Sequence, residues 1–224
     1  MGYDTDFVGQ VTVDPPLNPY EVEYLDRFAE TRHESRQQGP YAVNGNGLAV
    51  EEMYGGKEPP PGLPGYWCAW VPTAAGDALI WNGAEKFYDA EIWLAYLIDT
   101  FLKPGAVISG EPADPVPGRF FPSVFERFGC DHVLNGVITA EGDEEDDVWR
   151  IEVRDNVVHV VRRVDGPWHA DTDPLAADPS TSARQAELAV RTRRNHVFVV
   201  GGDGEFRDLG PAAEAGFTPI DPVR

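Results

Sequence analysis

The chain has few positive charges. Lysine and arginine together number 18 against 38 aspartates and glutamates, and the formal net charge over 224 residues is -20. Nucleic-acid phosphates and anionic lipid headgroups repel a protein this acidic, so direct nucleic-acid binding and membrane-surface binding are not expected. The charge favours a protein partner with a basic surface, although it can also serve solubility alone.

Cysteines and long apolar runs are also scarce. The two cysteines, Cys68 and Cys130, are too few for a disulfide framework. Residues 1–13 contain neither a basic segment nor an apolar core of signal-peptide length. The longest apolar run, near residues 92–102, is interrupted by Asp99, so no membrane-spanning segment is expected. These absences predict a cytoplasmic protein with reduced thiols.

Hydrophobic periodicity predicts an α+β fold, in which an antiparallel sheet carries one or two helices on one face. The first helix should begin at Asn18, because Asn18-Pro19-Tyr20-Glu21 combines a capping residue, a proline and a glutamate that can close a capping box. It should end near residue 35. The second helix is expected at residues 89–102. Strands are expected at residues 7–13, 66–71, 78–81, 132–140, 148–154, 157–164, 196–200 and 205–209.

Proline and glycine clusters divide the chain into a core and a tail. Residues 1–164 are predicted to form the core domain, with loop-rich inserts at 39–65 and 104–131. Residues 165–182 are polar and contain three prolines, as in a linker or long loop. Residues 183–224 are predicted to form a C-terminal appendage of one helix and one hairpin.

Several segments in the middle of the chain combine aromatic and polar residues in a recognisable order. They are Trp67-Cys68-Ala69-Trp70, residues 79–88, residues 93–98, and residues 134–142 followed by the Asp155-Asn156 turn. Over residues 66–161 the chain resembles a group of small acidic proteins from phage and bacterial genomes. That group has no assigned activity, so the resemblance implies a shared fold unit and no catalytic role.

The predicted turn at residues 141–147 has six carboxylates in seven positions. It lacks the ligand order and the closing glutamate of an EF-hand loop, so tight calcium binding is not expected. The turn could present a phosphate-like surface to a basic partner, or it could be a solvated hairpin tip. The residues proposed for partner binding are Glu141, Asp143, Glu144, Glu145, Asp146 and Asp147.

A second candidate is a ligand pocket rich in aromatic side chains. Six tryptophans could line a stacking site for a planar ligand, or they could simply pack the core. The segment 85–88 could supply acid–base groups, or its charges could face water. The residues assigned to this possible pocket are Trp67, Trp70, Trp81, Glu85, Tyr88 and His132.

The segment Cys130-Asp131-His132 offers potential metal ligands or a Cys–His pair. No second ligand pair stands at a zinc-site spacing, and no local signature marks a catalytic thiol. We therefore predict no metal, no cofactor and no catalytic residue.

The sequence favours a non-enzymatic acidic interaction protein that binds a basic protein partner, as an inhibitor, an immunity-type factor or a nucleic-acid mimic. One alternative is a small hydrolase or transferase that uses Glu85, Tyr88 or His132 in a tryptophan-lined cleft. Another is a sponge for a nucleotide-like small molecule. No sequence feature specifies an oligomeric state.

Overall fold

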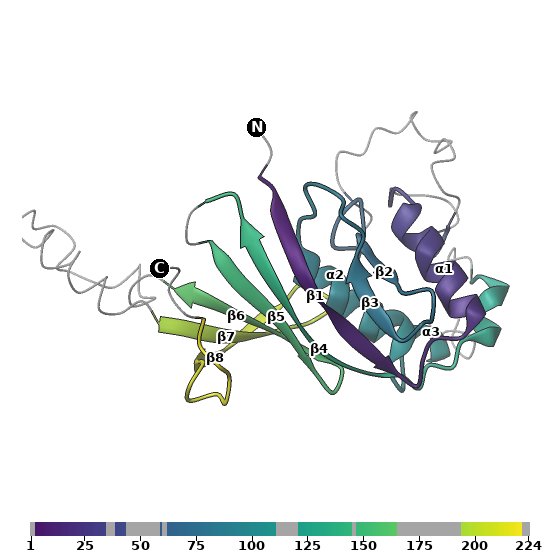
Figure 1. Ribbon diagram of the computed structural model, residues 1–224. Coiled ribbons are helices and arrows are strands. Elements are labelled where there is room, and N and C mark those ends of the chain that lie inside the picture. The colour runs from purple at the N-terminus through teal and green to yellow at the C-terminus, as the bar shows by residue number, and fades with distance from the viewer. Residues whose placement is uncertain are drawn as a thin grey trace, which may run out of the picture.

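An eight-stranded antiparallel sheet forms the centre of the computed structural model (Figure 1). The structure describes residues 3–34, 39–43, 59, 62–110, 121–144, 147–164 and 194–220. The strand order is β2-β3-β1-β4-β5-β6-β7-β8. The strands are β1 (Thr5–Asp14), β2 (Trp70–Pro72), β3 (Ala78–Trp81), β4 (Val133–Gly142), β5 (Val148–Arg154), β6 (Val157–Val164), β7 (Arg194–Val200) and β8 (Phe206–Pro211).

The helices cover one face of this sheet, which confirms the predicted α+β class. Residues that alternate along the strands point into the core beneath them, as the period of two requires, and Phe7, Val11, Leu134 and Ile138 are all buried. Trp93 and the rest of the second helix pack against them. The helical elements are α1 (Pro19–Glu30), α2 (Ala90–Leu97), the π-helix η2 (Ile98–Leu102), α3 (Val107–Gly110) and the 3-10 helix η3 (Ser123–Arg127).

The segment Ala90–Gly110, which contains α2, η2 and α3, has the length and apolarity of a membrane-crossing helix, and it is the one such segment in the described part of the chain. Its most apolar 18 residues have a mean hydropathy of 1.2, and 61% of that window is buried inside the fold. A buried core helix passes the same test, so this run is weak evidence for a membrane span.

The predicted start of α1 is confirmed, but its predicted end is wrong. The Asn18 side chain accepts hydrogen bonds from the backbone N–H groups of Tyr20 and Glu21, and the Glu21 carboxylate accepts from the Asn18 N–H. The helix stops at Glu30 rather than near residue 35, because Thr31 takes an extended conformation. The strand predicted at residues 66–71 is also shorter, since pairing with β3 begins only at Trp70.

The C-terminal hairpin of β7 and β8 continues the main sheet, because β7 pairs with β6 along its whole length. On the face opposite the helices, Val161 and Val197 form a small second core with Ala212 and Phe217. The Arg154 guanidinium lies 3.5 Å from the Phe217 ring centroid. The predicted linker (165–182) and the predicted C-terminal helix lie outside the described residues.

Candidate functional site

A buried pair of titratable side chains, Glu21 and His132, joins α1 to the chain just before β4. The exposed fraction of the Glu21 side chain is 0% and that of His132 is 3%, and the two lie 3.1 Å apart between Nε2 and Oε1. His132 Nδ1 lies 2.7 Å from the Pro15 carbonyl oxygen. The Glu21 carboxylate also accepts the Gly129 N–H at 2.7 Å. The capping glutamate of α1 thus binds its own N-cap residue and the segment 129–132 just before β4.

The hydrogen-bond partners of His132 determine its protonation. The Pro15 carbonyl can only accept, so Nδ1 must carry a proton, and an ionised Glu21 requires a proton on Nε2 as well. Burial lowers the pKa of His132, but the hydrogen bonds to Glu21 and Pro15 outweigh burial and raise the pKa above its ordinary value. Burial raises the pKa of Glu21, yet the hydrogen bonds from His132, Asn18 and Gly129 hold it below the ordinary value. The contacts of the pair therefore favour the imidazolium form of His132 and the carboxylate form of Glu21, that is, an ion pair.

Both ring nitrogens of His132 have partners inside the fold, Nε2 in Glu21 and Nδ1 in Pro15. The neighbouring Cys130 thiol lies 3.5 Å from the Phe101 carbonyl oxygen, and burial raises its pKa, which disfavours the reactive thiolate. Within the described residues, no cluster of three or more His, Cys, Asp or Glu side chains is placed to hold a metal ion. Through the bonds of His132 to Glu21 and Pro15, the segment 130–132 connects α1 to the start of β4.

An open cleft of about 640 Å³ lies beside the loop that connects β3 to α2. That volume is within the range of about 300–1,000 Å³ that is usual for small-ligand sites. Trp67 stands at the cleft with 46% of its surface exposed, although tryptophan is mostly buried in folded proteins. The lining residues are Ala29, Glu30, Trp67, Cys68, Ala69, Asn82, Ala84, Glu85, Lys86 and Phe87.

Local hydrogen bonds hold the β3–α2 loop in one conformation. The Asn82 side chain accepts the Ala84 N–H at 2.9 Å, and the Lys86 N–H donates to the Asp4 carboxylate at 3.1 Å. Lys86 and Asp89 both have positive φ, 57° and 55°, a region that is strained for such residues. The turn at Lys86 lets Phe87 pack against Trp70 in the core while Glu85 stays at the cleft.

The residues predicted for the ligand pocket do not all meet. Trp67 and Glu85 line the cleft, and Trp81 adjoins it through a hydrogen bond from its Nε1 to the Ala84 carbonyl oxygen. Tyr88 belongs to the same loop, but its side chain is exposed and is not part of the lining. Trp70 is buried, with its Nε1 donating to Ala90 O at 2.7 Å. His132 lies apart from the cleft in its ion pair with Glu21.

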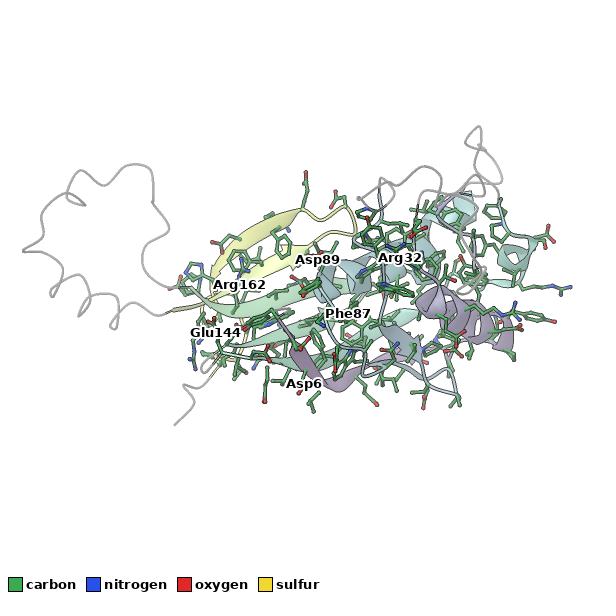
Figure 2. All side chains as sticks on the ribbon, turned by 90° about the horizontal axis from the view of Figure 1, so that it is seen from above. Asp6, Arg32, Phe87, Asp89, Glu144 and Arg162 are labelled. Atoms are coloured by element: carbon green, nitrogen blue, oxygen red, sulfur yellow. The ribbon has the colours of Figure 1, made fainter. Side chains whose placement is uncertain are left out.

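The acidic turn predicted between β4 and β5 lies beside the start of β1, at the top of Figure 1. The Asp4 N–H donates to the Asp143 carboxylate at 2.9 Å, and the Tyr3 hydroxyl donates to Asp147. Figure 2 looks down on this end of the sheet and labels Asp6 and Glu144. We call this surface the acidic end and define it by six described carboxylates: Asp4, Asp6, Glu141, Asp143, Glu144 and Asp147. Glu145 and Asp146 lie outside the described residues.

The acidic end carries unbalanced charge. None of its six described carboxylates forms an ion pair with a described lysine, arginine or histidine. Asp6 and Glu141 stand directly opposite each other in the β1–β4 register, and directly opposed like charges destabilise a sheet. The fold therefore tolerates a local electrostatic cost at this end.

Sequence reasoning missed Glu30 in the cleft wall, the acidic residues of β1 and the role of Glu21 beyond its helix. The capping motif identified Glu21 as a cap, but its partner His132 is 111 positions away. Nothing in the sequence near Glu30 marks it as a neighbour of Trp67. These groupings arise from strand order, which no local pattern determines.

No family model, curated protein or solved structure matches this chain. Its function is therefore inferred from the chemistry of the acidic end and the cleft.

Proposed function

We propose that this chain is a non-enzymatic binding protein whose acidic end docks against a basic surface of a partner protein. The observation that carries the proposal is the direct opposition of Asp6 and Glu141 among carboxylates that have no ion-pair partner in the described part of the chain. Repulsion between such groups is relieved when lysine or arginine side chains approach from outside. Binding of a basic partner therefore reduces the repulsion that remains between these carboxylates in the folded protein.

The carboxylates are also held in fixed positions before a partner arrives. β1 and β4 pair over ten consecutive residue pairs, from Thr5 opposite Gly142 to Asp14 opposite Val133, and Asp143 is bonded to the Asp4 backbone. A charged surface carried on paired strands loses little conformational entropy when it binds. Its summed field should also accelerate encounter with a cation-rich surface.

An inhibitor, an immunity-type factor and a nucleic-acid mimic would all use this same surface. The alternative of a hydrolase or transferase has less support, because His132 is committed to Glu21 and does not join Glu85 at the cleft. The nucleotide-sponge alternative also has less support, since Glu30 and Glu85 in the cleft wall repel phosphate.

The test compares three baits in affinity capture from cells of the source organism. The first is the wild type, and the second neutralises four exposed residues of the acidic end: Asp6→Asn, Glu141→Gln, Asp143→Asn and Glu144→Gln. The third is a control with the same net charge, in which four exposed carboxylates elsewhere are neutralised: Glu126→Gln, Asp155→Asn, Glu205→Gln and Glu214→Gln. The proposal predicts a basic protein that the wild type and the control retain and the acidic-end variant loses.

The captured partner is then measured kinetically with all three proteins. Steering by the acidic end should make the association rate constant of the acidic-end variant about tenfold lower at 10 mM salt. The difference should shrink at 150 mM salt, where the Debye length is about 8 Å. Equal association of all three proteins at low salt would reject the proposal.

A further inference from the structure

The cleft beside the β3–α2 loop has a wall of aromatic and acidic side chains. Within the described part of the chain, Trp67 makes no ring–ring or cation–π contact, and neither Glu30 nor Glu85 forms an ion pair. Among the described lining residues the one cation is Lys86, against two carboxylates. The nearby Arg32 is engaged by the Tyr66 ring, 4.8 Å away, and by Glu34. The cleft is therefore net negative.

Glu30 occupies an unfavourable position in its own helix. It is the last residue of α1, where the helix dipole disfavours negative charge. Asp26 stands one turn earlier, and like charges four residues apart repel. Burial first, and then the charge of Glu30, raises the pKa of the Asp26 carboxyl above its ordinary value. A cation placed in the cleft would relieve this repulsion.

We propose that this cleft binds a guanidinium group, stacked on the Trp67 indole and hydrogen-bonded to Glu30 and Glu85. A guanidinium is planar and stacks on aromatic faces, and its donors match carboxylate oxygens in pairs. An ammonium group is more strongly hydrated and cannot present the same flat face. A nucleotide would place its phosphates against two carboxylates.

The size of the cleft indicates where the guanidinium comes from. At about 640 Å³, the cleft is larger than one arginine side chain, which leaves room for peptide on either side. The bond from the Lys86 N–H to Asp4 also places the cleft next to the acidic end, where basic surfaces are expected to approach. An arginine within an extended peptide therefore fits better than a free small molecule. The cleft is nevertheless a separate site, and its binding does not depend on the proposed function of the acidic end.

The test is titration of the whole protein with defined probes, followed by NMR of the tryptophan indole N–H signals. The probes are Nα-acetylarginine amide, its neutral isostere Nα-acetylcitrulline amide, AMP, and a pentapeptide with arginine between two glycines on each side. The arginine probe should bind with a Kd on the order of 1 mM, a modest affinity for a single side chain, and should shift the Trp67 indole signal. The citrulline probe should bind at least tenfold more weakly. Tighter binding of the pentapeptide than of the amide assigns the ligand to a peptide, and equal binding assigns it to a free guanidinium compound.

Substitutions show whether the arginine probe binds in the cleft or elsewhere on the surface. Trp67→Leu should weaken arginine binding by roughly 5- to 30-fold, from the loss of a cation–π contact. Glu30→Gln and Glu85→Gln should each weaken it by roughly 3- to 10-fold. Glu126→Gln and the four-residue acidic-end variant should leave it unchanged, so failure of this inference is distinguishable from failure of the proposed function. Equal binding of citrulline and arginine, unchanged binding to Trp67→Leu, or tighter binding of AMP would each overturn the inference.

Discussion

Replacing Glu21 by glutamine tests the buried ion pair most directly. Glutamine keeps the shape of the side chain, but it removes the charge that balances the His132 imidazolium and presents an N–H₂ group where an acceptor stood. Removal of one partner from a buried ion pair destabilises a protein by about 3–5 kcal/mol. The carboxylate now accepts three hydrogen bonds, from His132 Nε2 and from the N–H groups of Asn18 and Gly129. The single oxygen of glutamine can still accept two of them. We therefore expect a loss of about 3 kcal/mol in the free energy of unfolding.

The matched control is Glu23→Gln, the same substitution two residues along the same helix. Glu23 is exposed and pairs with Arg27 at 2.6 Å, one turn away. Exposed pairs of this kind contribute about 0.3–0.5 kcal/mol. Urea denaturation followed by circular dichroism should resolve the roughly sixfold difference between the two variants.

The stability difference between the wild type and Glu21→Gln should also depend on pH. The pKa of His132 is raised above 6.5, so its contribution is complete below pH 6.5 and is lost as the pH rises through the higher folded value. The pKa of Glu21 is lowered below 4.5, so its contribution is complete above pH 4.5 and is lost as the pH falls through the lower folded value. The difference between wild type and Glu21→Gln should be largest between pH 4.5 and 6.5 and should shrink by pH 9. A difference no larger than that of Glu23→Gln, or one that is the same at pH 6 and pH 9, would refute the ion pair.

Two further predictions concern backbone and thiol chemistry. Gly9 has φ of 126°, and an added Cβ would lie 2.3 Å from the Val137 carbonyl oxygen. Because strain at such a backbone position causes large losses of stability, Gly9→Ala should lower the free energy of unfolding by at least about 3 kcal/mol. Thermal unfolding checks this, with the exposed Val8→Ala as the control, and a Gly9→Ala melting temperature like that of Val8→Ala would contradict the geometry. Burial raises the pKa of Cys68 to about 12, so iodoacetamide at pH 8 should label Cys130 first and leave Cys68 unmodified in the folded protein. Peptide mass mapping shows which cysteine is labelled first. Early labelling of Cys68 would contradict its burial in the folded protein.

Local patterns in the sequence predict much of the fold. The alternation of apolar residues indicates β4, β5 and β6, and Asp155-Asn156 predicts their tight turn, in which both residues have positive φ. The Asn18-to-Glu21 motif predicts the start of α1. These features depend on residues within a few positions of one another, so a short stretch of sequence includes all the interacting residues.

The sites depend on residues that are far apart in the chain. The opposition of Asp6 and Glu141 is set by the β1–β4 register, and the Glu21–His132 pair is set by how α1 packs beside the start of β4. Sequence patterning does not predict that Glu30 and Trp67 line the same cleft. Such contacts depend on the order of the strands in the sheet. Several strand orders would bury the same apolar residues, so the sequence pattern does not choose between them.

The position of β1 in the sheet has a consequence for how the molecule forms. The first strand of the chain lies between β3 and β4, and its ten pairings with β4 join residues about 120 to 140 positions apart. A growing polypeptide can pair β1 with β3 early, but it cannot complete the pairing of β1 with β4 until residue 142 has been synthesised, and contacts over such long separations form slowly. During that interval the first strand has an open edge that other chains could pair with. Asp6 in β1 and Asp4 just before it place negative charge beside this edge, and such charges disfavour pairing between exposed strands of different chains.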